Sequence, residues 1–351
     1  MSASTERLEQ RLRQALRAAR SPWADAALQP MADKGLAHHH VRLVGTGAIA
    51  RLPKQSQMGL EAQANLDYQA ACFERASAAG SGPRLFGVLA PSDALPRGGL
   101  LVQEIVGRPA RLPDDLPAIA QALAAIHALP LPPPGQRAPL RDDPDPLLAL
   151  AHEIDAQAVH LDAAGLAPPS RVHIDAQLAA LRARCNATGR PARRLIGFDA
   201  HPGNFIVRDG GHAVLVDLEK ARYSHPPLDL AHATLYTSTT WDVDVYAELD
   251  VDQIADTYAQ WAAHAEAARA DRAWWVPLRA AMWLWSVTWC AKWRVLSPRA
   301  AQQRSGGEDW SSAHSDDKLV AHVRDRVDCY LSAPVIEHVV DELAALEKRF
   351  A

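Results

Sequence analysis

The chain has 351 residues, of which 48% are hydrophobic and 22% charged, and its formal net charge is −4. This balance is that of a globular protein, long enough for two domains or for one fold of two lobes. Because no basic block stands out, the sequence excludes an electrostatic footprint for nucleic acid or an anionic membrane, and the expected partner is a small molecule.

The cysteine spacing and the N-terminal segment indicate in which cellular compartment the protein is expected. The four cysteines lie far apart without a CxxC pair, which excludes a zinc site or a dense disulfide framework and favours a reducing cytoplasm. The first twenty residues lack the apolar core of a signal peptide. The tryptophan-rich stretch 273–293 contains Arg279 and Lys292, so no membrane span is expected there.

The first third of the chain predicts a lobe of antiparallel sheet with an embedded helix. Leucines four residues apart indicate an initial amphipathic helix, and β-forming runs bounded by glycine or proline indicate strands. The predicted elements are a helix over 5–20, two or three strands within 35–53, a helix over 60–79, and strands over 84–89 and 99–105. We therefore expect an N-terminal lobe over residues 1–106.

The remainder, residues 107–351, is predicted to form a mainly helical C-terminal lobe. Its first clear helix covers 116–129, where an early proline is tolerated in the first turn. Two short strands, 204–208 and 213–216, interrupt the helical pattern and are joined by an Asp-Gly-Gly turn. A hairpin with polar flanks inside a helical lobe is a candidate position for a functional site.

Around this hairpin the sequence reads LIGFDAHPGNFIVRDGGHAVLVDLEKA. Phosphoryl transfer to a hydroxyl needs a carboxylate for the hydroxyl proton, oxygen ligands for Mg²⁺ and a means of holding the triphosphate. Asp199 and Asn204 share one loop, and Asp217 follows the second strand, which returns it beside Asn204. Asn204 and Asp217 can then offer the hard oxygens that Mg²⁺ prefers.

The same segment resembles the signature HGDxHPGN…IDxE of the aminoglycoside phosphotransferase and choline kinase superfamily, which has a protein-kinase-like fold. The resemblance implies that Asp199 is the catalytic base and that Asn204 and Asp217 are the Mg²⁺ ligands. Glu219 matches the second acidic position and is grouped with the acceptor site. Asp229, in the sequence PPLDLA, matches the continuation xxDLA.

One position departs from this signature. The family has a histidine two residues before the catalytic aspartate, where it serves as an internal prop of the loop, and this chain has Gly197. Two alternatives stay open at this point: a looser catalytic loop, or a protein that binds nucleotide without turning it over.

Further segments resemble the nucleotide site of the same family. GGLLVQEIVGRP is similar to the hinge strand that borders the adenine, and a short glycine-containing loop resembles the phosphate loop. A basic residue on the third strand would contact the phosphates. The residues implied to bind ATP are Gly35, Arg51, Gln103, Glu104, Ile105 and Val106.

The helix partner of Arg51 is left open between Glu61, Glu74 and Gln69. Three consecutive histidines at 38–40 invite a metal site, but neighbouring residues on a strand point to opposite faces and cannot converge on one ion. A polar hairpin close to the nucleotide is the better interpretation of these histidines.

The C-terminal segments AMWLWSVTWCAKWRV and VAHVRDRVDCYL resemble the closing helices of choline and ethanolamine kinases. Trp285 matches one of two tryptophans of the family, and an aromatic face attracts a quaternary ammonium. The alternative is that Trp285, Trp289 and Trp293, which lie on one helical face, belong to the core.

The sequence therefore predicts an α+β, two-lobed kinase-like enzyme that transfers phosphate from ATP to an alcohol, with Mg²⁺ as cofactor. Choline or a related amino alcohol is the leading acceptor. The alternatives are an aminoglycoside or sugar acceptor, for which an acidic stretch at 242–250 could form the pocket, and a non-catalytic nucleotide-binding protein. The oligomeric state is not predicted.

Overall fold

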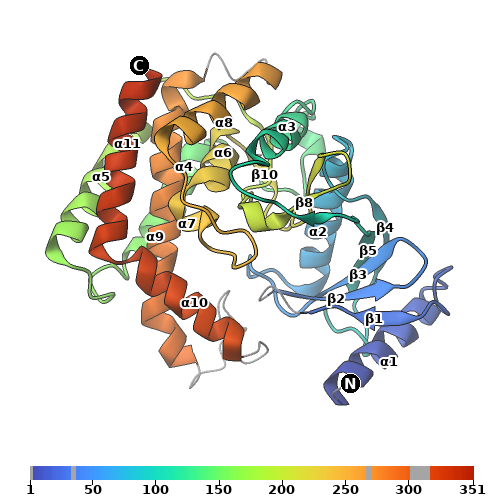
Figure 1. The fold of residues 1–351 in the computed structure, drawn as a ribbon. Coiled ribbons are helices and arrows are strands. Elements are labelled where there is room, and N and C mark those ends of the chain that lie inside the picture. Colours follow the sequence, from blue (N-terminus) through green and yellow to red (C-terminus); the bar gives the residue numbers. More distant parts are fainter. Residues whose placement is uncertain (1–2, 33–36, 266–270, 301–316) are drawn as a thin grey trace.

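A computed structural model describes residues 3–32, 37–265, 271–300 and 317–351. The chain folds into an N-terminal lobe built on an antiparallel sheet and a larger helical lobe, which confirms the predicted α+β class (Figure 1). Gly35, expected in the phosphate loop, lies outside the described residues.

The N-terminal sheet has five strands in the order β1-β2-β3-β5-β4, and each neighbouring pair is antiparallel. The strands are β1 (Leu28–Pro30), β2 (His38–Leu43), β3 (Ala48–Pro53), β4 (Leu85–Leu89) and β5 (Gly99–Gln103). The short edge strand β1 was not predicted, because three residues ending in proline carry no alternating pattern.

Helices cover both faces of this sheet. Because successive side chains on a strand alternate between faces, Leu101 packs with helix α1 (Ala3–Ala18) in one hydrophobic cluster. Its neighbours Leu100 and Val102 belong to the cluster that contains helix α2 (Ala62–Ser77). Figure 1 shows α1 on the outer side of the sheet and α2 between the sheet and the helical lobe.

The C-terminal lobe is organised around one long helix, α9, which packs against α4 and α6. Its Arg279, fully buried, donates to the Glu342 carboxylate of α11 at 2.8 Å. No helix of the described part is long and apolar enough to cross a bilayer. The helices are α3 (Leu116–His127), α4 (Pro146–Ala158), α5 (Pro168–Asn186), α6 (Pro227–Thr234), α7 (Tyr236–Thr239), α8 (Val251–His264), α9 (Trp275–Ala300), α10 (Asp317–Tyr330) and α11 (Ala333–Phe350).

Two small sheets position the candidate site within this lobe. The predicted hairpin is present as β8 (Phe205–Val207) and β9 (Ala213–Leu215), and β6 (Arg108–Pro109) pairs with β8. Strand β7 (Arg194–Ile196) pairs with β10 (Arg222–Ser224) and leads directly into the loop that carries Asp199. The sequence did not predict β6, β7 or β10.

Helix α2 joins the two lobes at the segment that follows the hairpin. The Tyr68 hydroxyl donates to the Ala221 carbonyl at 2.8 Å, and the Gln69 amide donates to the Glu219 carboxylate at 3.3 Å. Helix α2 of the first lobe therefore lies beside residues 219–221 of the second, and Arg51 of strand β3 contacts Asp217.

Candidate active site

The loop at 197–204 is held from beneath by one buried carboxylate. Asp229, fully buried in the first turn of α6, accepts hydrogen bonds from the backbone N–H groups of Gly197 and Phe198, each at 2.7 Å. Bonds of this kind, between an ionised acceptor and backbone donors, are among the stronger ones in proteins. Asp229 thus fixes the backbone immediately before Asp199.

The orientation of Asp229 is fixed in turn by a buried chain of donors. The Trp261 indole N–H donates to His127 Nδ1 at 3.0 Å, so the proton of the neutral ring is on Nε2. His127 Nε2 then donates to Asp229 Oδ2 at 3.1 Å. Three donors therefore converge on this carboxylate, from His127 and from two backbone groups.

Phe198 adopts a backbone conformation that is rare for a bulky residue, with φ +61°. Its ring is stacked by the Arg222 guanidinium, 3.6 Å from the ring centroid. Such strain persists only where the surroundings over-determine it. Here the Asp229 bond and the Arg222 stack hold Phe198, and the strained residue presents the adjacent Asp199.

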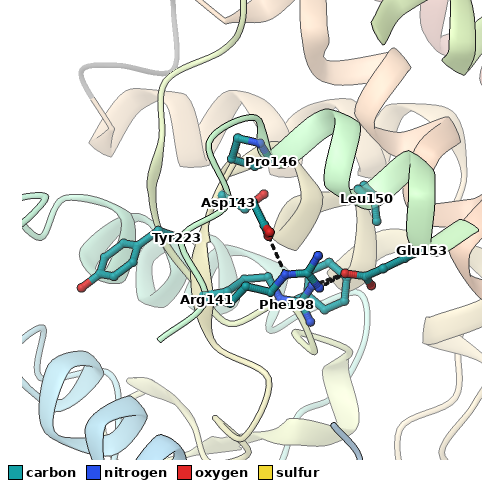
Figure 2. Close-up of a pocket in the computed structure, with 9 residues that line it drawn as sticks. Arg141, Asp143, Pro146, Leu150, Glu153, Phe198 and Tyr223 are labelled. Carbon is teal, nitrogen blue, oxygen red and sulfur yellow. Dashed lines mark hydrogen bonds and ion pairs between the residues drawn. The ribbon is translucent and has the colours of Figure 1, made fainter. Parts of the chain in front are cut away.

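A small cavity lies behind the Phe198 ring. Figure 2 shows Arg141 at this cavity between Asp143 and Glu153, and Arg222 also donates to Glu153, at 3.0 Å. Charged side chains that form ion pairs with one another surround this cavity, so we interpret it as a structural region that stabilises the loop at 197–204.

Gly197 occupies the place of the family histidine. A Cβ atom there would lie 2.7 Å from the Leu215 side chain and 3.5 Å from Asp229 Oδ2. The end of strand β9 therefore fills the space that a side chain at residue 197 would need. The backbone at this position is supported by Asp229.

Asp199 lies among basic groups. Its Oδ2 is 2.9 Å from the Lys220 ammonium, and its Oδ1 is 3.8 Å from Nδ1 of His232. Burial alone would raise the pKa of Asp199, but the charge and hydrogen bond of Lys220, together with the neighbouring histidines, outweigh it and hold the pKa well below its usual value. Burial lowers the pKa of His232 to about 4, so its ring is neutral, and Nδ1 donates to the Phe198 carbonyl at 3.1 Å.

The two expected metal ligands are adjacent. The Asn204 carbonyl accepts from the Val216 N–H at 2.9 Å, which places Asn204 beside Asp217 as the hairpin predicts. The Asn204 side-chain nitrogen donates to the Asp199 carbonyl at 2.8 Å. Because the amide nitrogen is used in this way, its oxygen is left to face a ligand.

Arg51 reaches this site from the other lobe. Its guanidinium is 2.5 Å from Asp217 Oδ1 and 3.2 Å from His38 Nδ1, and the side chain is 4% exposed. His38 also contacts Gln69 of helix α2 at 3.1 Å. Burial, and then the charge of Arg51, lower the pKa of His38 well below its usual value, so this ring is neutral.

Of the three proposed helix partners of Arg51, only Gln69 lies in this network. Glu61 and Glu74 are exposed, whereas Gln69 is 2% exposed. Gln69 donates to Glu219 and contacts His38, which in turn contacts Arg51. The helix therefore supplies a neutral amide at this position.

Glu219 is buried on the side of the N-terminal lobe. One of its oxygens lies 3.5 Å from His38 Nε2, and the other, Oε1, is buried without a hydrogen-bond partner among the described residues. Burial, and then the negative charge of Asp217, raise the pKa of Glu219 well above its usual value. A carboxylate with an unsatisfied oxygen beside a second carboxylate is suited to a cation.

The hinge residues divide into two pairs. The Gln103 N–H donates to Arg84 and the Glu104 N–H to Gly47, and the Glu104 carboxylate pairs with an arginine of β2. The N–H groups of Ile105 and Val106 have no acceptor among the described residues. The backbone N–H groups of Ile105 and Val106 therefore differ from those of Gln103 and Glu104, which already have acceptors within the N-terminal lobe.

Trp285 is half-buried beside the loop at 197–204. Its ring packs edge-on against Phe198, with centroids 5.3 Å apart, and lies 6.4 Å from the ring of His232. The Lys220 ammonium lies 5.6 Å from the Trp285 centroid. This position borders Asp199, whereas Trp293 is buried in the core.

Sequence reasoning did not find Lys220, Arg222 or His232 as parts of the site. Lys220 directly follows Glu219, and His232 lies one helical turn after Asp229. The spacing in α6 carries a usable signal, since residues three apart share a helix face.

A family model and several solved structures are similar to this chain. A sequence model described as the phosphotransferase enzyme family matches residues 32–266, more than half of the chain. No curated protein sequence matches significantly.

Among solved structures, similar chains include a choline/ethanolamine kinase family protein from Mesorhizobium loti, with 18% identity, a TM-score of 0.55, and coverage of 97% of this chain and 99% of that one. Choline kinase LicA from Streptococcus pneumoniae matches with 12% identity, a TM-score of 0.52 and coverage of 90% and 99%. Macrolide 2'-phosphotransferase MphH from Brachybacterium faecium matches with 14% identity, a TM-score of 0.53 and coverage of 85% and 96%.

These similarities show a shared fold, and the sequence match shows the family. The predicted superfamily, the kinase-like fold and the enzyme class, transfer of phosphate to a hydroxyl group, are confirmed. The chain belongs to the phosphotransferase enzyme family.

Proposed function

We propose that the protein transfers the terminal phosphoryl group of ATP, bound with Mg²⁺, to an alcohol group of a small molecule. The observation that carries this proposal is the meeting of Asp199, Asn204 and Asp217 on one loop and hairpin, with Arg51 reaching Asp217 from the other lobe. These are the parts that phosphoryl transfer requires.

The oxygen donors fit a hard divalent cation. Asn204, Asp217 and Glu219 offer an amide oxygen and two carboxylates, and the buried Oε1 of Glu219 has no partner among the described residues. Mg²⁺ prefers such ligands and, when bound, offsets the charge of the phosphates. We therefore propose that Glu219 is a metal ligand and not, as expected from the sequence, part of the acceptor site.

We place the nucleotide between the lobes 1–106 and 107–351. The backbone N–H groups of Ile105 and Val106 are available to the base, and Arg51 is the cation for the phosphates. Arg51 is desolvated and close to Asp217, so its guanidinium is positioned for phosphate oxygens beside the metal ligands.

Asp199 is proposed to orient the acceptor hydroxyl and take its proton. The Lys220 charge lowers the pKa of Asp199, which keeps the carboxylate ionised and makes it a weak base. A loose transition state demands orientation of the hydroxyl more than early removal of its proton. The strained Phe198 and the Asp229 anchor supply this orientation.

The acceptor itself stays a prediction. The prediction of choline as acceptor depends on Trp285. The prediction of an aminoglycoside depends on acidic residues such as Asp242, which borders the loop at Gly203. The non-catalytic alternative rested on Gly197, whose backbone is anchored by Asp229. The cytoplasmic location expected from the cysteine spacing also stays a prediction.

The test is ADP release with MgATP and a panel of polyols, sugars, hydroxy acids, amino alcohols and aminoglycosides. We expect acceptor-dependent release that is lost in Asp199→Asn. Asp209→Asn, an exposed aspartate in the hairpin turn, is the matched control and should keep wild-type rates. Tight MgATP binding without transfer to any acceptor would favour the non-catalytic alternative.

A further inference from the structure

Lys220 occupies the position where a cationic acceptor would be recognised. Its ammonium lies 2.9 Å from Asp199 Oδ2 and 5.6 Å from the centroid of the Trp285 ring. The side chains of Lys220 and Asp199 are each 17% exposed, so water screens this pair only in part.

A quaternary ammonium beside the reacting hydroxyl would need two features of the site. It would need the Trp285 face, which attracts cations through the ring quadrupole, and the negative charge of Asp199. The Lys220 ammonium already interacts with both the Trp285 ring and the Asp199 carboxylate. A second cation within a few ångströms would be repelled by Lys220 in surroundings that are largely desolvated.

Two histidines beside Asp199, His201 and His232, provide hydrogen bonds without negative charge. His201 Nδ1 accepts from the Gly203 N–H at 3.2 Å, so the proton of a neutral His201 is on Nε2, which can donate. His232 uses its Nδ1–H on the Phe198 carbonyl, which leaves Nε2 as an acceptor. Such a set matches hydroxyl and carboxylate oxygens of an acceptor.

We propose that Lys220 selects acceptors whose reacting hydroxyl stands on an uncharged or anionic framework, such as a sugar, a polyol or a hydroxy acid, and rejects alkylammonium alcohols. This inference rests on the proposed function and names the acceptor class of the same site. Lys220 then acts as a specificity-determining residue through its charge.

The test uses choline and its uncharged carbon isostere 3,3-dimethylbutan-1-ol, which differ only in the charge at the branched centre. Binding of each is measured by calorimetry with wild type, Lys220→Met and Lys220→Arg, so turnover is not required. We expect choline to bind at least tenfold more tightly to Lys220→Met than to wild type, and Lys220→Arg to behave like wild type. Binding of the isostere should change less than threefold.

Several results would overturn the proposal. Choline binding to wild type as tightly as to Lys220→Met would do so, as would a wild-type preference for choline over its isostere. Failure of choline to bind Lys220→Met would also do so, because the ring and the carboxylate would then be open. Melting temperatures and MgATP affinity are measured on the same preparations. Loss of MgATP binding in all three proteins would instead refute the proposed function.

Discussion

Asp229→Asn is the substitution that tests the loop anchor most directly. The carboxylate receives three donors: the N–H groups of Gly197 and Phe198, and Nε2–H of His127. Trp261 fixes the His127 tautomer by donating to the other ring nitrogen. An asparagine offers one oxygen and one NH₂ group, so at least one buried donor would face another donor whichever way the amide turns.

The size of the effect follows from these contacts. A hydrogen bond to a charged acceptor contributes about 1.5–3 kcal/mol, and leaving a buried donor unpaired costs about 1–3 kcal/mol. Asp229→Asn loses at least one such bond and leaves one N–H unpaired, so we expect unfolding to become easier by about 3–5 kcal/mol. A shift of about 1 Å in Asp199 would lower kcat about 10²-fold.

Glu342→Gln is the matched control for stability. Glu342 is also a buried carboxylate, paired with the buried Arg279, and the pair links α9 and α11. Arg279 also donates to the Thr234 carbonyl at 3.0 Å, at the opposite end of α6 from Asp229. Breaking a buried ion pair costs about 3–5 kcal/mol. We therefore expect a similar loss of stability in urea unfolding, with kcat per folded molecule within about threefold of wild type.

The two variants together separate anchoring from stability. Steady-state ADP release, corrected for the folded fraction, should show a loss of kcat only in Asp229→Asn. A wild-type kcat in folded Asp229→Asn would refute the anchor. Equal losses of kcat in both variants would show that general destabilisation, and not the position of Asp199, lowers the rate.

The remaining predictions concern four residues. Asp199→Asn should lower kcat about 10²–10⁴-fold with MgATP affinity near wild type, and near-wild-type turnover in acceptor kinetics would exclude it as the base. Asp217→Ala should abolish MgATP binding in calorimetry; unchanged affinity would show that it is not a metal ligand. Trp285→Ala should raise the acceptor KM more than the ATP KM, whereas a lower melting temperature with unchanged KM would identify a core residue. Burial lowers the pKa of His225 from 6.5 to about 4, so stability is full above pH 6.5 and falls as the pH drops towards 4, by up to about 3 kcal/mol. His38 and His232 are buried neutral in the same way and keep their own contributions, so urea unfolding of His225→Phe should show a shallower slope than wild type, and an equal slope in both proteins would show that His225 does not contribute.

The longer elements of the fold were predictable from local patterns. The predicted helix over 60–79 is present as Ala62–Ser77, and the strand over 84–89 as Leu85–Leu89. Strands β6, β7 and β10 escaped prediction because they have two or three residues. A strand that short shows no alternation, and its partner is distant in sequence.

The partner of Arg51 shows a different limit. Charge alone pointed to Glu61 or Glu74, whereas the buried residue is Gln69. In this network Arg51 lies beside Asp217, and Gln69 bridges His38 and Glu219. The sequence could not show that the negative charge next to Arg51 would come from the other lobe, because that contact joins residues 166 positions apart.

Gly197 shows that a departure from a family motif does not by itself predict loss of activity in a single chain. The family histidine is implied to prop the loop, and its absence pointed to a loose or inactive site. In this chain Leu215 fills the space beside Gly197. Asp229 accepts hydrogen bonds from the N–H groups of Gly197 and Phe198, and Arg222 stacks on the Phe198 ring. The loss of one prop lowers activity only if the backbone it supported can move, and these contacts restrain that backbone independently of any side chain at residue 197.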